Sequence, residues 1–354
     1  MTRKRILYLL VLLLLVLLLG GLVYAYVSLS APEPVTATDV DVSPGLKHIR
    51  SIYAYGEGAD KLLQQPFGVA YRDGRLYVGQ VVKGTVVVFD DQGRPLSVIG
   101  KKGRAPGELN APNGIDVDSA GNVYVADPQH AKVVVYDPSG TMVKELANVK
   151  YPLIPRVVDD QKLYVSAYDS VKVYSLPGLQ ELSSWGTRGR GEAQYDFPNG
   201  IVVTDAGENV FVSDGNNMRL KRLDKNGEKV WIVGTPPKDM NDQNRLFGLP
   251  AGMAIAGDVL YIVDPLNGSI HLYRTDGTKI GEVGETGAEE GQFSYPSQIA
   301  WMGGSRFAVT EWGNDRVQIV EIDPGAVAGA AQDGQMGTPG STDETPATAT
   351  TAAP

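Results

Sequence analysis

Four acidic residues end equivalent short apolar segments of the chain. The segments read VYVAD, VFVSD, LYIVD and FAVTE, and they end at Asp127, Asp214, Asp264 and Glu311. Carboxylates of this kind can bind a hard cation or act as general acids and bases. They can equally be structural, because they accept hydrogen bonds from turn amides or pair with a nearby cation. In three segments a basic residue follows five positions later: Lys132, Arg219 and Arg316.

These residues lie in a repeated unit, which is clearest from Pro112 to Ala147. Four runs rich in Val, Ile and Tyr, as is typical of β-strands, occupy 114–118, 122–127, 132–137 and 142–147. Turn residues separate the runs, and the sequence Asp-Pro-Ser-Gly at 137–140 favours a type I turn. Short connections predict an antiparallel meander of four strands. One such sheet is too small to be stable alone, so it must stack on copies of itself.

The chain contains six such units, and a proline opens each one. The prolines recur about every 40 to 52 residues, a period typical of β-propellers. They are Pro66, Pro112, Pro152, Pro198, Pro250 and Pro296. Glycine follows two residues later in four units. The unit at 152–185 departs most from the pattern, with Pro155 in place of glycine and Ala167 in place of the acidic residue.

Taken over several units, the pattern resembles NHL repeats. These have a glycine-rich linker, Pro-x-Gly, a strand, Gly-Asn, a Val-x-Val-x-Asp strand and Asn-x-Arg-Val, and residues 198–219 and 284–317 show this order. The resemblance covers about 47–323. It implies an all-β fold, a six-bladed β-propeller of NHL type, which is often a binding platform and occasionally an enzyme.

The residue types can be compared with those that propeller enzymes need. There is no cysteine, and the three histidines, His48, His130 and His271, fall in different units, so no zinc site is predicted. No nucleophile elbow, phosphate loop or Cys/His pair occurs. A metal-dependent lyase or lactonase stays open as an alternative, and a divalent cation such as calcium is not excluded. The side chains with suitable chemistry are Asp264, Asn267, Glu311 and Asn314.

A transmembrane helix is predicted ahead of the propeller. Residues 1–5 include Arg3, Lys4 and Arg5, and 6–27 is a leucine-rich run without a charge. As a helix this run spans about 33 Å, against a hydrocarbon core of about 30 Å. The positive-inside rule then predicts a single-pass cell-membrane protein with a short cytoplasmic N-terminus and an extracytoplasmic propeller. The alternative is a signal peptide cleaved near Ala25.

The segments that flank the repeats have different compositions. Residues 28–46 read as an extended linker, and residues 324–354, rich in Ala, Gly, Thr and Pro, as a disordered tail. The last unit, which begins at Pro296, supplies only three strands. We expect the strand-like run 48–55 to complete it and to close the ring, which also covers two sheet edges.

The predicted binding surface is the face of the ring that carries the inter-blade linkers. The chain has a net charge of −9, which argues against nucleic acid as a partner. Linker charges are segregated: Lys101, Lys102, Arg104, Arg188 and Arg190 mark a basic side, and Glu57, Asp60, Glu285, Glu289 and Glu290 an acidic side. Exposed aromatic and arginine side chains are typical interface anchors, and Trp312 lies in a loop of the last unit.

The sequence therefore predicts an anchored binding or scaffold module for a protein or peptide partner of the cell envelope. The candidate binding residues are the five basic linker residues, Trp312 and the four acidic residues that end the second strands, some of which could line the central opening. One alternative is ordinary solvated loop charge with Trp312 packed on a neighbouring loop. Another is a ligand-sensing ectodomain that acts through a membrane partner.

Overall fold

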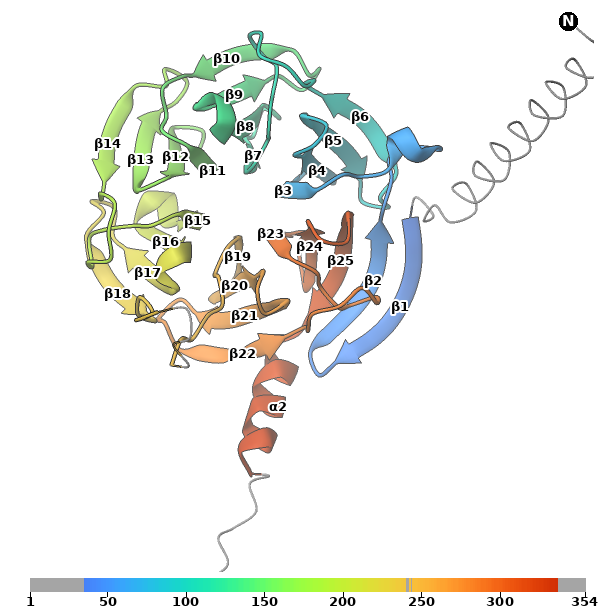
Figure 1. Cartoon of the computed structure of the whole chain (residues 1–354), viewed down its shortest axis with the longest axis vertical. Helices are drawn as coiled ribbons and strands as arrows, with labels where there is room; N and C mark the ends of the chain where they lie inside the picture. Colours follow the sequence, from blue (N-terminus) through green and yellow to red (C-terminus); the bar gives the residue numbers. More distant parts are fainter. Residues whose placement is uncertain (1–34, 240–241, 243, 337–354) are drawn as a thin grey trace, which may run out of the picture.

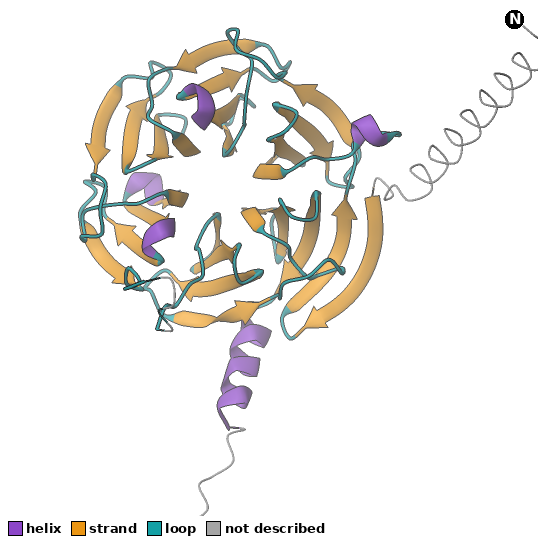
Figure 2. Ribbon diagram, viewed as in Figure 1, coloured by secondary structure: helices purple, strands orange, loops and turns teal. Residues whose placement is uncertain are grey.

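Six sheets stand radially around a central axis in the computed structural model, which describes residues 35–239, 242 and 244–336 (Figure 1). In blades 1 to 5 the first strand lies nearest the axis and the last strand at the rim (Figure 1 and Figure 2). Neighbouring strands of every blade pair antiparallel, as short connections require. The prediction of an all-β, six-bladed propeller is confirmed.

Blades 1 to 5 each have four strands in chain order. Blade 1 contains β3 (Pro66–Arg72), β4 (Arg75–Gln80), β5 (Thr85–Asp90) and β6 (Pro95–Ile99). Blade 2 contains β7 (Ile115–Val117), β8 (Val123–Asp127), β9 (Lys132–Tyr136) and β10 (Met142–Leu146). Blade 3 contains β11 (Pro152–Val158), β12 (Lys162–Ala167), β13 (Ser170–Ser175) and β14 (Glu181–Trp185). Blade 4 contains β15 (Pro198–Thr204), β16 (Asn209–Asp214), β17 (Arg219–Leu223) and β18 (Lys229–Val233). Blade 5 contains β19 (Met253–Ala256), β20 (Val259–Asp264), β21 (Ser269–Arg274) and β22 (Lys279–Val283).

Blade 6 joins the two ends of the repeat region. It contains β23 (Pro296–Trp301), β24 (Arg306–Glu311) and β25 (Arg316–Ile322), and then β2 (Leu46–Ile52) and β1 (Val35–Ser43) from the start of the chain. β2 pairs with β25, with His48 opposite Val320. The closing strand thus runs over 46–52, where the sequence predicted 48–55.

The predicted linker 28–46 is wrong from residue 35 onwards, because β1 is a fifth strand of blade 6. β1 and β2 form a hairpin around Pro44 and Gly45, and Ser43 lies opposite Leu46. Val35 and Val42 of β1 pack against apolar clusters on either side of the blade. The Pro, Thr and Asp content of this segment concealed a strand that partly buries one apolar side chain near each end.

The predicted disordered tail 324–354 is also wrong at its start, because α2 (Pro324–Met336) follows β25 directly. Its residue Val327 is buried and joins the apolar cluster between blades 5 and 6. The helix fits there because Gly45 and Gly281 leave space: a Cβ at Gly281 would lie 2.5 Å from Val327. Residues 337–354 lie outside the described part of the chain.

Apolar clusters between neighbouring blades form the core, one cluster for each pair of blades. The Pro-x-Gly glycines allow the backbones of adjacent blades to approach closely, because a Cβ at Gly200 would lie 2.2 Å from the Ala251 carbonyl oxygen. The prediction that Pro155 replaces the glycine of the third unit is wrong. Ile154, not Pro155, takes the glycine position, since it pairs with Ser166 as Gly200 pairs with Ser213.

The predicted anchor at 6–27 falls outside the described residues. In the part of the chain that the structure covers, no helix is long and apolar enough to cross a membrane.

Candidate functional site

The linkers between blades and the loops between second and third strands lie on one side of the ring. We call this side the linker face; it is turned toward the viewer in Figure 1. Two of its loops are short 3-10 helices, η2 (Pro128–His130) and η4 (Gly215–Asn217). Every candidate residue from the sequence lies on or just beneath this face, because second strands end there and axial strands begin there.

The four acidic residues that end the second strands are fully buried, so a partner cannot contact them. Each carboxylate accepts hydrogen bonds from backbone amides of the linker that enters its own blade. The donors are Asn110 and Ala111 for Asp127, Asp196 for Asp214, Gly248 and Leu249 for Asp264, and Ser294 for Glu311. The carboxylates therefore hold the linkers against the blades, and they do not line the central opening.

Arginine completes this arrangement in blades 4 and 6. Arg219 Nε donates to Asp214 at 2.9 Å and Arg316 Nε to Glu311 at 2.7 Å. The remaining guanidinium nitrogens donate to carbonyl oxygens of the same linkers, those of Arg190, Gly191, Gln194, Ala288, Glu289 and Gln292. A linker is thus bound by its amides to the carboxylate and by its carbonyls to the arginine.

Blades 2 and 5 use histidine at this place. Lys132 pairs with Glu145 and not with Asp127, whose partner is His130, with Nδ1 at 2.9 Å. In blade 5, His271 Nε2 lies 3.2 Å from Asp264, and its Nδ1 lies 3.1 Å from Glu282. Burial opposes a charge on His271, but its two carboxylate partners outweigh burial and raise its pKa.

The four residues proposed as cation ligands form two separate pairs. Asn267 Nδ2 donates to Asp264 at 3.2 Å in blade 5, and Asn314 Nδ2 donates to Glu311 at 2.7 Å in blade 6. Each pair is already used in holding its own loop. Over the described residues, no group of three or more His, Asp or Glu side chains gathers in a way that could hold a metal ion.

The basic residues of the linker between blades 1 and 2 are exposed. Lys101 pairs with Glu108 of the same linker at 2.9 Å, and Lys102 Nζ donates to the carbonyl oxygen of Val82 at 2.7 Å. Arg104 is exposed as well. The charge of this linker is therefore partly balanced within it.

The other basic pair lies two blades away and is held by local contacts. The guanidinium of Arg188 lies over the ring of Tyr168, 5.0 Å from its centre, with Asp196 at 4.0 Å. Arg190 donates to the carbonyl oxygen of Pro237. Blades 2 and 3 separate the two basic linkers, so they form two exposed basic sites at the rim and not one continuous patch.

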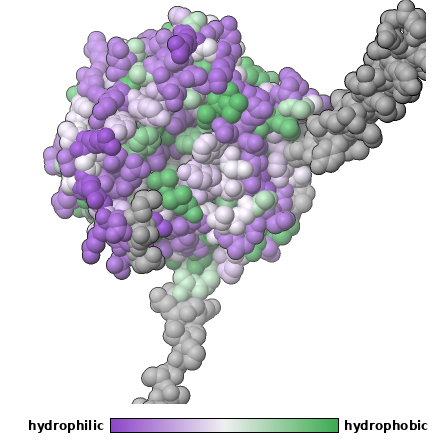
Figure 3. Space-filling model, viewed as in Figure 1, coloured by the Kyte–Doolittle hydropathy of each residue, from purple (hydrophilic) through white to green (hydrophobic). Residues whose placement is uncertain are grey.

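Trp312 lies at the mouth of a cavity on the axis of the linker face. The cavity has a volume of about 420 Å³ and is lined by Phe67, Asn113, Tyr151, Phe197, Asn199, Asn216, Leu249, Ala251, Pro265, Tyr295, Ser297 and Trp312. These residues come from all six blades or the linkers that enter them. Figure 3 shows this face with pale and green residues around its centre and hydrophilic residues at its rim.

Two groups of aromatic rings form opposite parts of the cavity wall. Phe197 contacts Tyr151 with ring centres 5.4 Å apart and Tyr168 with centres 5.6 Å apart. Tyr295 and Trp312 form an edge-to-face pair at 5.3 Å. Trp312 remains 39% exposed, so it packs on Tyr295 and also faces solvent. Of the predicted binding residues, it is the one that this cavity includes.

The sequence contains a pattern that marks part of the cavity wall. In three units an aromatic residue directly precedes the opening proline: Tyr151, Phe197 and Tyr295. Since that proline begins the axial strand, the residue before it lies at the axial opening.

On the opposite face, Arg156 of blade 3 bridges the two neighbouring blades. It donates to the carbonyl oxygens of Ile201 in blade 4 and Ile115 in blade 2, at 3.0 and 3.2 Å. Burial raises the pKa of the neighbouring Asp116 carboxyl, although Arg156 acts in the other direction. Arg156 therefore has a structural role that sequence reasoning missed.

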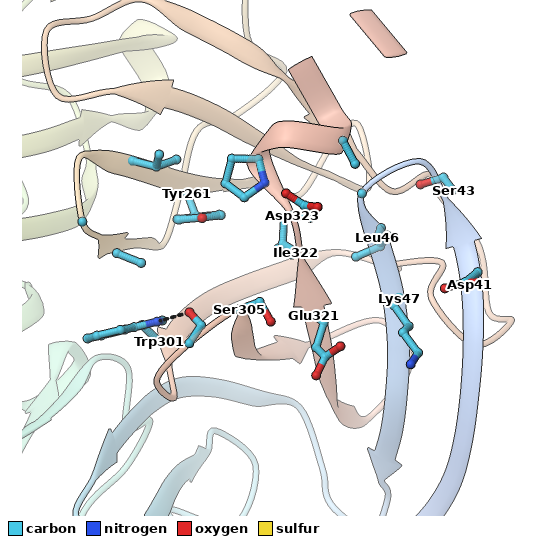
Figure 4. Close-up of a pocket in the computed structure, with 17 residues that line it drawn as sticks. Asp41, Ser43, Leu46, Lys47, Tyr261, Trp301, Ser305, Glu321, Ile322 and Asp323 are labelled. Atoms are coloured by element: carbon cyan, nitrogen blue, oxygen red, sulfur yellow. Dashed lines mark hydrogen bonds between the residues drawn. The ribbon is translucent and has the colours of Figure 1, made fainter. Parts of the chain in front are cut away.

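A cavity of about 690 Å³ lies beside blade 6 on that opposite face (Figure 4). Its charged residues are Asp41, Lys47, Glu321 and Asp323. Lys47 pairs with Asp39 at 2.6 Å, and the Trp301 indole donates to the carbonyl oxygen of Gly304. No contact ties the three carboxylates to a common point, so this cavity offers weaker support for a site than the axial one.

Comparisons with known proteins agree with the fold. A family described as "6-bladed beta-propeller" matches residues 58–223. NHL repeat-containing protein 3 of Homo sapiens is 29% identical over 140 residues, which is 38% of this chain and 39% of that protein. NHL repeat-containing protein 2 of Gallus gallus is 26% identical over 149 residues, 40% of this chain and 19% of that protein. The chain thus matches less than half the length of these relatives.

Among solved structures, a structural genomics protein from Bacteroides thetaiotaomicron VPI-5482 superimposes with a TM-score of 0.57. It is 16% identical in sequence, and the match covers 83% of this chain and 89% of that one. A likeness at this level of identity concerns the fold.

Proposed function

Because the chain is a six-bladed β-propeller with NHL-type repeats, we propose that it is a binding and scaffold module that holds a protein or peptide partner on its linker face. The axial cavity carries this proposal. Its walls come from all six blades, so it exists only in the closed ring, and its aromatic lining is of the kind that anchors partners. Loops held on a rigid scaffold are the usual place for such recognition.

The exposed basic residues at the rim would orient the partner. Lys101, Lys102 and Arg188 are exposed, and rim charges act mainly on the rate and salt dependence of association. Because Glu108 and Asp196 already balance part of this charge, we assign affinity to the axial cavity and orientation to the rim.

We further propose that residues 6–27 anchor the module in the cell membrane, with the propeller outside. β1 begins at Val35, and Val35 lies opposite Ile52, from which the chain continues into a linker of the linker face. The seven residues 28–34 can span at most about 24 Å. The linker-face edge of blade 6 is therefore tethered near the bilayer, which favours a partner that is itself at the membrane surface.

Protease accessibility tests this topology. Protease added to intact spheroplasts should digest the propeller or its connections. Without protease, the intact protein should be released only when the membrane is dissolved. Protection of the propeller in intact spheroplasts would reject the orientation. A soluble form beginning near Tyr26 would show that the segment is a cleaved signal peptide.

Crosslinking in the native envelope, followed by quantitative mass spectrometry, tests partner binding. We expect a defined partner to be recovered with the wild type, less of it with Trp312→Ala, and a weaker salt dependence with the double variant Arg188→Glu, Arg190→Glu. The matched control is Trp301→Ala, which changes a tryptophan that is 45% exposed on the opposite face. Equal recovery with the wild type and with both linker-face variants would place the binding surface elsewhere.

A further inference from the structure

The lining of the axial cavity is uncharged. All of the described side chains that line it are aromatic, aliphatic, hydroxyl or carboxamide groups. Charged groups around the cavity are already engaged: Asp196 accepts a hydrogen bond from Asn216 at 3.2 Å, Lys150 pairs with Asp169 at 2.7 Å, and Asp315 accepts the Gln65 amide at 2.7 Å. An ion that entered this cavity would lose its hydration without gaining a counter-charge. The lining therefore selects an uncharged ligand.

Strained backbone positions the aromatic walls. Tyr151, Phe197 and Tyr295 have φ values of 49°, 60° and 53°. Bulky residues rarely adopt this left-handed conformation, and each instance costs about 1–3 kcal/mol. Such strain gathers at ligand sites, where the surrounding structure maintains it. A positive φ directly before the opening proline recurs in four of the six units, at Gln65, Tyr151, Phe197 and Tyr295, and in three of them the residue is aromatic and lines the axial cavity.

Carboxamides supply the polar groups of the cavity. Asn113, Asn199 and Asn216 line it, and each carries both a hydrogen-bond donor and an acceptor. Among the described atoms, Asn113 Oδ1 is buried and accepts no hydrogen bond. A buried acceptor without a donor is costly, so a ligand N–H that reached this oxygen would gain a hydrogen bond that the free protein does not make.

From these observations we propose that the axial cavity binds an uncharged peptide segment that contains proline, with proline rings between the aromatic walls and a backbone N–H donated to Asn113. This rests on the proposed function and specifies the chemistry of the partner. Extended proline-containing segments have no internal hydrogen bonds, so their carbonyl oxygens are free to accept from carboxamides. Aromatic-lined grooves are the usual receptors for them.

Isothermal titration calorimetry of the full-length chain in detergent tests the proposal. The probe is a blocked peptide of four Ala-Pro repeats, in which alanine supplies the N–H groups. A blocked peptide of four Gly-Ser repeats and the neutral sugar maltohexaose are the comparisons. We expect the Ala-Pro peptide to bind most tightly. Its affinity should change less than about twofold between low and high salt, because no ion pair forms.

Two variants locate the site. Trp312→Ala should weaken peptide binding by about tenfold or more, the effect of losing one good aromatic anchor, while Trp301→Ala on the opposite face should have no effect. Asn113→Ala should also weaken binding, yet leave the melting temperature unchanged or raised, because it removes an unsatisfied buried acceptor. If Asn113 were purely structural, its replacement by alanine would instead lower the melting temperature.

The proposal is overturned if the Ala-Pro peptide does not bind, if Trp312→Ala binds it as well as the wild type, or if maltohexaose binds better in a Trp312-dependent way. The last result would assign the cavity to a saccharide. Failure here is separable from failure of the proposed function. If envelope partners are still recovered through the linker face, the proposed function holds although the peptide proposal fails. If the peptide binds but no envelope partner is recovered, the chemistry of the cavity holds although the proposed function fails.

Discussion

At the scale of residues, carboxylates that could do chemistry are used to hold the ring together. Glu311 is buried between a linker amide and Arg316, and burial raises its pKa even though Arg316 favours the charged form. A buried carboxylate that lost its partner would be left uncompensated, which typically costs about 3–5 kcal/mol. The basic partner of this carboxylate differs between blades: it is arginine in blades 4 and 6 and histidine in blades 2 and 5.

His271 should make stability depend on pH. Its folded-state pKa is raised above the ordinary value of 6.5, so its contribution is complete below about pH 6.5 and is lost as pH rises through the folded pKa. Burial by itself would raise the pKa of the Glu282 carboxyl, but His271 lowers it to about 2. The contribution of Glu282 to stability is therefore complete above about pH 4.5 and is lost as pH falls. Thermal unfolding of His271→Gln should therefore differ most from the wild type near pH 5.5 and least near pH 9.

The control for this effect is Glu282→Gln, which removes one partner but keeps the histidine. It should reduce the pH dependence without abolishing it, because Asp264 remains 3.2 Å from His271. A wild-type advantage over His271→Gln that is the same at pH 5.5 and pH 9 would show that the histidine stays neutral throughout.

At the scale of elements, two segments outside the repeat pattern complete the fold. β1 adds a fifth strand to blade 6, and α2 packs on β22 through one buried side chain, Val327. Both meet at Gly45, where a Cβ would lie 2.4 Å from Val327. The start and the end of the propeller are thus coupled by a second contact next to the sheet closure.

Removing this contact should destabilise the protein measurably. Val327→Ala should lower the free energy of unfolding by about 1–2 kcal/mol, since it removes most of one buried apolar side chain. Differential scanning calorimetry would detect this as a fall of a few degrees in melting temperature. Gly329→Ala is the matched control. It lies in the same helix with nothing within 4 Å of its Cβ, and it should leave stability equal or slightly raised. Equal melting temperatures for Val327→Ala and the wild type would mean that α2 does not contribute.

At the scale of the whole molecule, the ring is closed by strand pairing between distant parts of the chain. β2 buries Leu46 and Ile52 in different clusters, one on each side of blade 6. Without β2, the third strand β25 would be an exposed apolar edge, which is an aggregation hazard. The axial cavity depends on this closure, because Trp312 and Tyr295 belong to blade 6 and Phe67 to blade 1.

Truncation from the N-terminus should show a graded loss. A chain that begins at Val35 should fold and melt as one unit. A chain that begins at Pro44 loses β1 and should be modestly less stable. A chain that begins at Gly58 also loses β2 with the large buried apolar side chains of Leu46 and Ile52, worth about 1.5–3 kcal/mol each, and should aggregate or melt far lower. Comparable melting temperatures for the chains that begin at Val35 and Gly58 would contradict closure by β2.

The sequence by itself determined the blade count and the strand pattern, because alternating apolar residues and turn residues act locally and recur in each unit. It also showed which carboxylates recur, but not their use. Asp127 and Glu311 look alike in sequence, whereas their burial and their linker partners depend on how a linker folds back over its blade. The strand at 35–43 and the helix at 324–336 lacked a pattern because each gains stability from a few contacts with distant residues. The sequence carried part of the axial cavity as the aromatic residue before three opening prolines, but the cavity itself was decided by tertiary structure, since its walls come from residues in every blade that only a closed ring brings together.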